Sequence, residues 1–237
     1  MISAWSSIGD PLVAEALAAC GHDAVTFDLQ HGAIAPDRLL SLLQAASVHR
    51  TPTLVRIPWN DPADAMRALD LGAHGVIAPM IQGPDDVRRL VDACRYAPDG
   101  NRSFGPTRAA LAFGADYAAT ANERVVVGAM IETRTAYEAL DEVLSVPGLD
   151  LAFVGPADLS QALGGPPGSD FEEGRIPEAL ARVADRCRAH GVTAGVFCRS
   201  PRYARRMLQA GFAFVTVDSD LAHLQRGARE AMRIARG

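Results

Sequence analysis

Short apolar runs rich in β-branched residues alternate along the chain with longer segments whose apolar positions recur at helical spacing. The short runs predict eight strands, at residues 2–5, 24–28, 53–57, 75–79, 125–131, 149–154, 193–197 and 213–217. Helix-opening pairs such as Asp10-Pro11 and Asp61-Pro62 follow the strands, and Gly21 and Gly72 mark helix ends. The chain is therefore predicted to alternate strand and helix eight times.

This alternation favours parallel strands joined by right-handed helical crossovers. Eight units in 237 residues give about 30 residues each, the size of one βα unit. We therefore predict one domain over residues 1–237, folded as a (β/α)8 TIM barrel. The alternative, an open doubly wound sheet, typically carries a G-x-G-x-x-G turn after its first strand. No such motif occurs, and no NAD site is expected.

The amino-acid composition excludes several classes of enzyme. The chain has 23 basic and 28 acidic residues, a net charge of −5, and every basic residue is arginine. Schiff-base aldolases, pyridoxal-phosphate enzymes and P-loop NTPases each need a lysine amine, so these three classes are excluded.

The arginines are dispersed and form no basic stripe, so a nucleic-acid partner is not expected. No apolar run is long enough for a signal peptide or a membrane span. The four cysteines form no CxxC pair, which is typical of reduced thiols in a cytoplasmic protein.

Two long loops interrupt the alternation, at residues 95–108 and 164–175. Long loops in a compact domain are often functional. The first is expected to bring Arg102 and Arg108 near the barrel mouth.

Ionisable residues follow several of the predicted strands. The carboxyl ends of all strands of a barrel meet at one mouth, where active sites lie. Asp28 and His31 follow the second strand, and Arg56 ends the third. His31 is a candidate catalytic residue, with loop capping as the alternative. Arg56 is expected to face the site beside Asp28, or else only to form a salt bridge with it.

Glu132 follows the fifth strand and Asp158 the sixth. Each alone could cap the following helix. Together, on adjacent strands, they are typical ligands of a hard divalent cation such as Mg²⁺ or Mn²⁺, with Co²⁺ as a further candidate. Trp5 is expected to form a pocket wall, or to pack in the core. Asp70, in the helix after the third strand, reads on pattern alone as a solvated residue.

Six motifs in this order resemble the HpcH/HpaI family of class II pyruvate aldolases. They are Asp28-Leu-Gln-His-Gly32, Val55-Arg-Ile-Pro58, residues 71–80 (LGAHGVIAPM), Arg102-Ser-Phe-Gly105, Ile131-Glu-Thr133 and residues 153–160 (FVGPADLS). The resemblance spans Trp5 to about Leu224. It implies a (β/α)8 barrel in a homo-oligomer, a trimer or hexamer, whose C-terminal helix, here residues 221–235, is exchanged between protomers.

The resemblance also implies site roles. Glu132 and Asp158 would bind the metal, His31 would be the acid/base residue, and Arg56 would stabilise the enolate. Asp70 would hydrogen-bond the catalytic histidine. The substrate would contact Trp5, Met130, Gly155 and Pro156, and its carboxylate would bind the backbone amides of Ala157 and Asp158.

Two positions depart from the best-known members of that family. Met130 stands where they often carry glutamine, and Gln30 where they often carry glutamate. A thioether is a poor hydrogen-bond partner, so contacts at the 2-oxo group or on the aldehyde side of the substrate are expected to differ from those of these members.

The predicted reaction is metal-dependent, reversible cleavage of a 4-hydroxy-2-oxo acid, of the 2-keto-3-deoxy acid type, to pyruvate and an aldehyde. Without lysine the electron sink must be a metal rather than an imine. One alternative is a carbon–carbon lyase acting on a CoA thioester of the malyl or citramalyl type, with Arg102 and Arg108 serving the nucleotide. The other is a non-catalytic relative that binds keto acid and metal.

Overall fold

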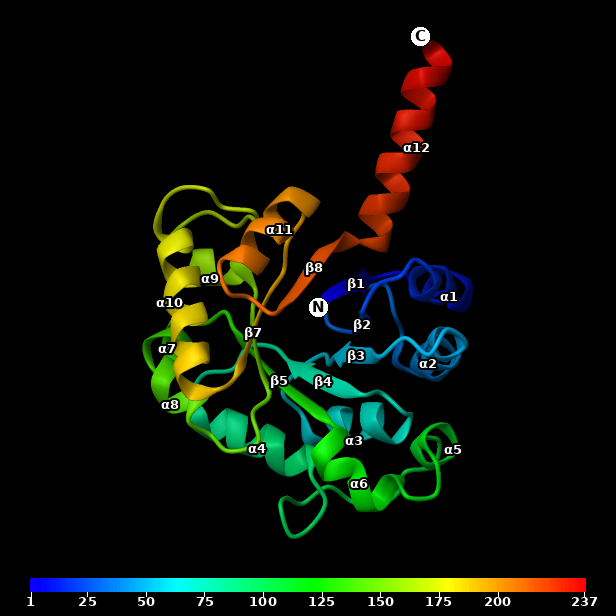
Figure 1. The fold of residues 1–237 in the computed structure, drawn as a ribbon, viewed down its shortest axis with the longest axis vertical. Helices are drawn as coiled ribbons and strands as arrows, with labels where there is room; N and C mark the ends of the chain where they lie inside the picture. Colours follow the sequence, from blue (N-terminus) through cyan, green and yellow to red (C-terminus); the bar gives the residue numbers. More distant parts are fainter.

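Eight parallel strands close into a barrel in the computed structural model, which describes residues 1–237. Their neighbours follow the order of the chain, and β8 pairs with β1 (Figure 1). The strands are β1 (Ile2–Ser6), β2 (Ala24–Asp28), β3 (Thr53–Arg56), β4 (Gly75–Ala78), β5 (Val126–Ile131), β6 (Leu151–Val154), β7 (Thr193–Val196) and β8 (Phe214–Ser219). The (β/α)8 prediction and all eight predicted strands are confirmed, and no strand end differs from its predicted position by more than two residues.

Helices form the outer ring around these strands. They are α1 (Pro11–Ala19), α2 (Leu39–Ser47) after the 3-10 turn η1 (Pro36–Arg38), α3 (Pro62–Asp70), α4 (Pro84–Cys94), α5 (Ala109–Phe113), α6 (Tyr117–Arg124), α7 (Arg134–Glu138), α8 (Leu140–Leu144), α9 (Pro156–Ala162), α10 (Arg175–His190), α11 (Pro201–Gln209) and α12 (Asp220–Arg236).

The helix starts follow from local sequence. Asp10, Asp61 and Ser200 accept hydrogen bonds from first-turn amides, and each is followed by a proline at the first helical position. Such caps satisfy amides that have no partner within the helix. They explain why local signals were enough to locate these elements.

The buried side chains form two main layers. The larger apolar cluster fills the space between strands and helices. A smaller one lies inside the barrel and consists of Trp5, Ala24, Leu54, Ile77, Met130, Leu151, Phe153 and Phe214. The interior is therefore packed, and space for a ligand exists only at an end of the barrel.

The long loop at residues 95–108 lies at the opposite end of the barrel from the one predicted. It follows the end of α4, so it belongs to a helix-to-strand connection, and those connections run at the amino ends of the strands. The guanidinium of Arg102 is fully buried there, with Nη2 donating to Asp70 Oδ1 at 2.7 Å and Nη1 to the Tyr117 hydroxyl at 3.1 Å. Arg108 donates to the backbone oxygen of Leu71, at the end of α3. The expectation that these arginines lie near the mouth was wrong.

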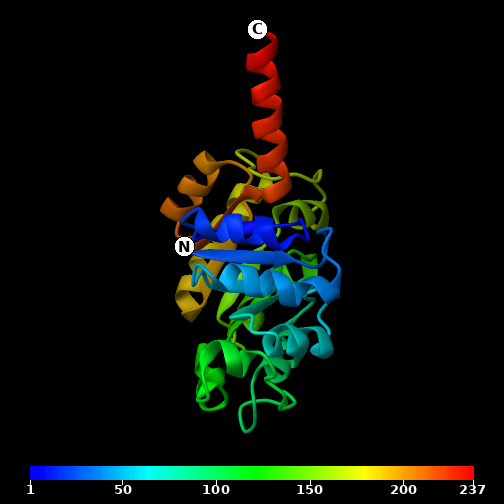
Figure 2. The same ribbon diagram turned by 90° about the vertical axis from the view of Figure 1, so that its right-hand side faces the viewer.

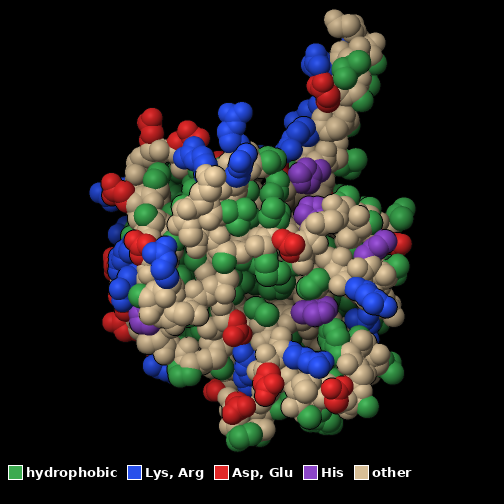
Figure 3. Space-filling view, in the orientation of Figure 1, with side chains coloured by type: hydrophobic (Ala, Val, Ile, Leu, Met, Phe, Trp, Pro, Cys, Tyr) green, Lys and Arg blue, Asp and Glu red, His purple; other side chains and the backbone are tan.

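The last helix, α12, projects away from the barrel (Figures 1 and 2). Its only buried residue is Asp220, while Leu221, Leu224, Met232 and Ile234 expose 46–65% of their surface. The space-filling view shows apolar and arginine side chains along this helix, with no other part of the chain against its outer half (Figure 3). No helix of the chain combines the length and apolarity that crossing a membrane requires.

Candidate active site

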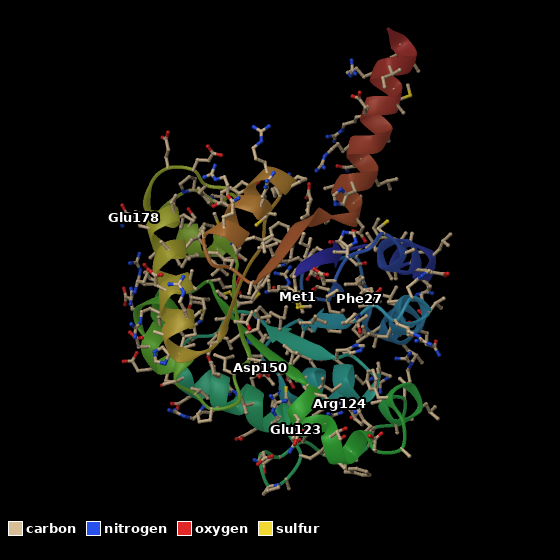
Figure 4. All side chains as sticks on the ribbon, viewed as in Figure 1. Met1, Phe27, Glu123, Arg124, Asp150 and Glu178 are labelled. Carbon is tan, nitrogen blue, oxygen red and sulfur yellow. The ribbon has the colours of Figure 1, made fainter.

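A cavity of about 290 Å³ opens at the carboxyl ends of the strands. It is lined by Trp5, Ser7, Asp28, His31, Arg56, Met130, Phe153, Gly155, Pro156, Ala157, Asp158, Phe197 and Ser219. Figure 4 labels Met1 and Asp150, which directly precede β1 and β6. The turned view of Figure 2 places the N-terminus on the side that faces the viewer in Figures 1 and 4, so the cavity opens on the opposite side. The polar residues predicted from strand ends, Glu132 aside, thus line one cavity.

The Asp28–Arg56 pair forms one wall. The two residues are register partners on β2 and β3. Arg56 Nε donates to Asp28 Oδ1 at 2.8 Å, and Nη2 donates to Oδ2 at 2.6 Å. The predicted neighbourhood of these residues is confirmed, and the fork leaves Nη1 for the cavity.

Burial acts to raise the pKa of Asp28. The hydrogen bonds and charge of Arg56, with bonds from the His31 amide and the Trp5 indole, outweigh it, and the pKa lies below the ordinary value. Asp28 is therefore an anion that holds the guanidinium in place. The guanidinium also lies over the Trp5 ring, 4.9 Å from its centroid.

His31 lines the cavity, and the residue is exposed to solvent. Its backbone amide donates to Asp28 Oδ1 at 3.1 Å, in the turn that follows β2. The side chain is thus held beside Arg56 through a shared aspartate while its ring stays accessible to a ligand.

Glu132 lies beneath the lining at the end of β5, and only 2% of its surface is exposed. Oε1 accepts from the Met80 amide at 2.7 Å, and Oε2 has no hydrogen-bond partner. Met80 adopts a left-handed backbone conformation, φ 56°, which is uncommon for a non-glycine residue.

Burial raises the pKa of Glu132 to about 7; the Met80 amide opposes this, and the charge of Asp158 adds to it. A buried carboxylate oxygen without a partner, next to a second carboxylate, is the environment that a cation stabilises. The absence of a side chain at Gly155 leaves room for Glu132 Oε2, because a Cβ on residue 155 would lie only 2.4 Å from that oxygen.

These residues fit a divalent cation with few protein ligands. No group of three or more His, Cys, Asp or Glu side chains is arranged to hold a metal. A cation between Glu132 and Asp158 would therefore keep coordination positions for water and substrate oxygens, as Mg²⁺ often does.

The remaining wall is apolar. The Trp5 ring stacks on Phe153, with centroids 5.7 Å apart, and meets Phe197 edge-on at 5.5 Å. Met130 is buried beside Gly155. The sequence reasoning missed Ser7, Phe153, Phe197 and Ser219. Counting every second residue along each strand would have found the two phenylalanines, because alternate side chains point into the barrel.

Asp70 does not reach this cavity. It ends α3, at the amino-end face of the barrel, where Arg102 holds its carboxylate. Within one chain, the structure does not bring Asp70 to His31.

Taken together, the cavity presents a guanidinium fork, an imidazole, the Asp158 carboxylate and a short helix start, with the Glu132 carboxylate beneath its lining. This set can bind a 2-oxo acid, stabilise negative charge on its 2-oxo oxygen, and move a proton.

Comparisons with known proteins agree with the geometry. The family model described as HpcH/HpaI aldolase/citrate lyase matches residues 2–226. A hydroxypyruvate/pyruvate aldolase from Rhizorhabdus wittichii is 43% identical, covering 99% of this chain and 94% of its own. A 4-hydroxy-2-oxo-heptane-1,7-dioate aldolase from Salmonella paratyphi B is 35% identical, covering 96% of this chain and 87% of its own. The crystal structure of a HpcH/HpaI aldolase/citrate lyase family protein from Burkholderia cenocepacia superposes with a TM-score of 0.92 at 33% identity, over 100% of this chain and 95% of that one.

Proposed function

Because the chain belongs to the HpcH/HpaI aldolase/citrate lyase family, we propose that it is an aldolase that reversibly cleaves 4-hydroxy-2-oxo acids to pyruvate and an aldehyde. The observation that carries the proposal is that His31 and the Asp28–Arg56 pair line one cavity, while the unpartnered oxygen of Glu132 lies directly beneath its lining residue Gly155. The relatives named hydroxypyruvate/pyruvate aldolase support the pyruvate half of the substrate.

Glu132 and Asp158 would hold a divalent cation, Mg²⁺ or Mn²⁺. When bound there, the cation would supply Lewis-acid polarisation of the substrate's 2-oxo group, the electron sink that a chain without lysine cannot obtain from an imine. The backbone amides of Ala157 and Asp158 would receive the substrate carboxylate.

In this reaction, His31 transfers the proton and Arg56 stabilises the developing negative charge. His31 takes the proton of the 4-hydroxyl, the C3–C4 bond breaks, and the electron pair of that bond becomes the enolate of pyruvate. Arg56 donates to the developing enolate oxygen through the part of its guanidinium that Asp28 does not use. After the aldehyde leaves, His31 returns the proton to C3. An imidazole suits both transfers at neutral pH.

Free acids fit this chain better than CoA thioesters. Arg102 and Arg108 were the candidate nucleotide ligands, and both lie at the opposite end of the barrel. No other arginine besides Arg56 lines the cavity. We therefore propose a substrate without a nucleotide.

The direct test is a pyruvate-release screen over 4-hydroxy-2-oxo acids of varied length and charge. EDTA is expected to abolish pyruvate release, and Mg²⁺ or Mn²⁺ to restore it, because the cation supplies the electron sink. Coupling the released pyruvate to NADH oxidation gives the rate. Activity that chelation leaves unchanged would contradict the metal role. Binding of pyruvate and metal with no turnover and no exchange of the methyl protons would favour the non-catalytic alternative.

The exposed apolar side chains of α12 indicate that this helix packs against another molecule. We propose that residues 221–235 pack against a second copy of the chain, in a trimer or hexamer. Hydrogen bonding of Asp70 to His31, which the family resemblance implies, would then have to be made between copies, because the two residues lie at opposite ends of one barrel.

Sedimentation equilibrium tests this assembly. The chain of 25.1 kDa is expected to sediment as a trimer or hexamer. Replacing Leu224 and Met232 by Glu should shift the mass toward the monomer, because charges at an apolar interface are costly. A monomeric wild-type protein would contradict the assembly.

A further inference from the structure

The carboxylate of Asp220 lies next to the cavity without lining it, and the chemistry above does not use it. Only 5% of the residue is exposed. A buried carboxylate is costly unless its oxygens accept hydrogen bonds, so its partners indicate what it holds. Asp220 is also the first residue of α12, directly after β8.

Both oxygens of Asp220 are fully used. Oδ1 accepts from the Ser7 amide at 2.9 Å and from the Leu221 amide at 2.7 Å. Oδ2 accepts from the Ile8 amide at 3.0 Å and from the Ser6 hydroxyl at 3.1 Å. Three of the four donors come from residues 6–8, so Asp220 fixes the chain where it leaves β1.

That segment in turn holds the loop that carries His31. The Ser7 backbone oxygen accepts from the Ala33 amide at 2.7 Å, and Ile8 and Ala33 form an isolated parallel bridge. Gly32 packs so closely that a Cβ there would lie 3.1 Å from the Ser7 Cα and 2.2 Å from the Asp28 backbone oxygen. His31 is therefore held on one side by Asp28 and on the other through Ser7.

We propose that Asp220 is a positioning residue for His31. Its carboxylate fixes residues 6–8, these fix residues 32–33, and the position of the imidazole relative to Arg56 follows. This inference rests on the proposed aldolase function for its kinetic consequence. Asp220 is also the first residue of α12, so the same side chain fixes the start of that helix and supports the loop that carries His31.

Asp220→Asn tests the proposal with minimal change of shape. The asparagine amide keeps one accepting oxygen, but its NH₂ group faces backbone N–H groups, which can only donate. Ser6 can rotate its hydroxyl; the amides of Ser7 and Ile8 cannot. A misplacement of about 1 Å can reduce turnover on the order of 100-fold. We expect kcat for pyruvate release to fall about 10–100-fold. KM for the keto acid should stay within about threefold, because the carboxylate-binding and metal-binding residues lie on other strands.

A second readout needs no turnover. The ring resonances of His31, assigned by their loss in His31→Gln, are expected to shift in Asp220→Asn because the ring moves relative to Trp5 and Arg56. Asp218→Asn is the matched control: Asp218 is buried two residues away, pairs with Arg226, lies outside the cavity, and has φ 58°, which asparagine tolerates. Its kcat and His31 resonances should match wild type.

Unmoved His31 resonances, or a kcat within twofold of wild type, would overturn the positioning role. Equal changes of kcat, KM and melting temperature in Asp220→Asn and Asp218→Asn would also overturn it, because Asp220 would then only support the fold. Failure of the aldolase proposal looks different: wild type releases no pyruvate, while the His31 resonances still shift in Asp220→Asn.

Discussion

Glu132→Gln is expected to reduce pyruvate release on the order of 10³-fold or more. The amide keeps an oxygen for the Met80 amide, so the strand end should stay in place. It removes the negative charge from the one buried carboxylate oxygen that has no hydrogen-bond partner, and with it most of the cation affinity. Loss of Lewis-acid stabilisation worth several kcal/mol corresponds to such a factor. Turnover at saturating Mn²⁺ and calorimetric titration with Mn²⁺ give the two numbers.

The stability of this variant separates the metal role from a structural one. In the metal-free protein, burial raises the pKa of Glu132 to about 7, so the hydrogen bond from the Met80 amide and the charge of Arg56 only partly offset the desolvation of the charged side chain. Neutral glutamine removes that cost, and the metal-free variant should melt at the same temperature as wild type or higher. Glu138→Gln, on the exposed surface of α7, is the control and should bind metal and turn over normally. Full Mn²⁺ affinity in Glu132→Gln would contradict the assignment.

Arg56→Lys is expected to lower kcat about 10²–10³-fold, the usual effect of removing one oxyanion donor. The guanidinium binds both Asp28 oxygens and still has a nitrogen for the substrate. An ammonium is a single point charge, so it can pair with Asp28 or stabilise the enolate, but it cannot reproduce the planar fork. The charge of buried Asp28 also draws the lysine ammonium away from the cavity.

Exchange of the pyruvate methyl protons with D₂O isolates this effect, because it requires the enolate but no aldehyde. Exchange should fall in parallel with kcat in Arg56→Lys. Arg88→Lys, at an exposed position of α4, should exchange at the wild-type rate. Near-native exchange in Arg56→Lys would mean that another group stabilises the enolate.

Much of the fold was predictable because its signals are local. Strand and helix periods, prolines at first helical positions and side-chain caps each act within a few residues. Once a closed parallel barrel was inferred, strand-end residues had to share a mouth. This is why the sequence alone predicts that Asp28, His31, Arg56 and Asp158 share the mouth at which they line the cavity.

Other features depended on which face of the barrel a connection occupies. The arginine-containing loop follows α4 rather than β4, and this small difference along the chain moves Arg102 and Arg108 to the far end. Asp70 goes with them, because α3 returns from the mouth before it ends. A predicted loop is therefore located by the element that precedes it, not by its composition.

By itself, the sequence determined the barrel, the residues at its mouth and, through the absence of lysine, the exclusion of imine chemistry. Only the tertiary structure decided that Glu132 keeps an unpartnered oxygen beneath Gly155, and that Asp220 supports the chain near His31. The Asp220 contact joins residues 213 positions apart. No local period predicts such a pair, because it exists only after β8 pairs with β1 and buries Asp220 beside residues 6–8.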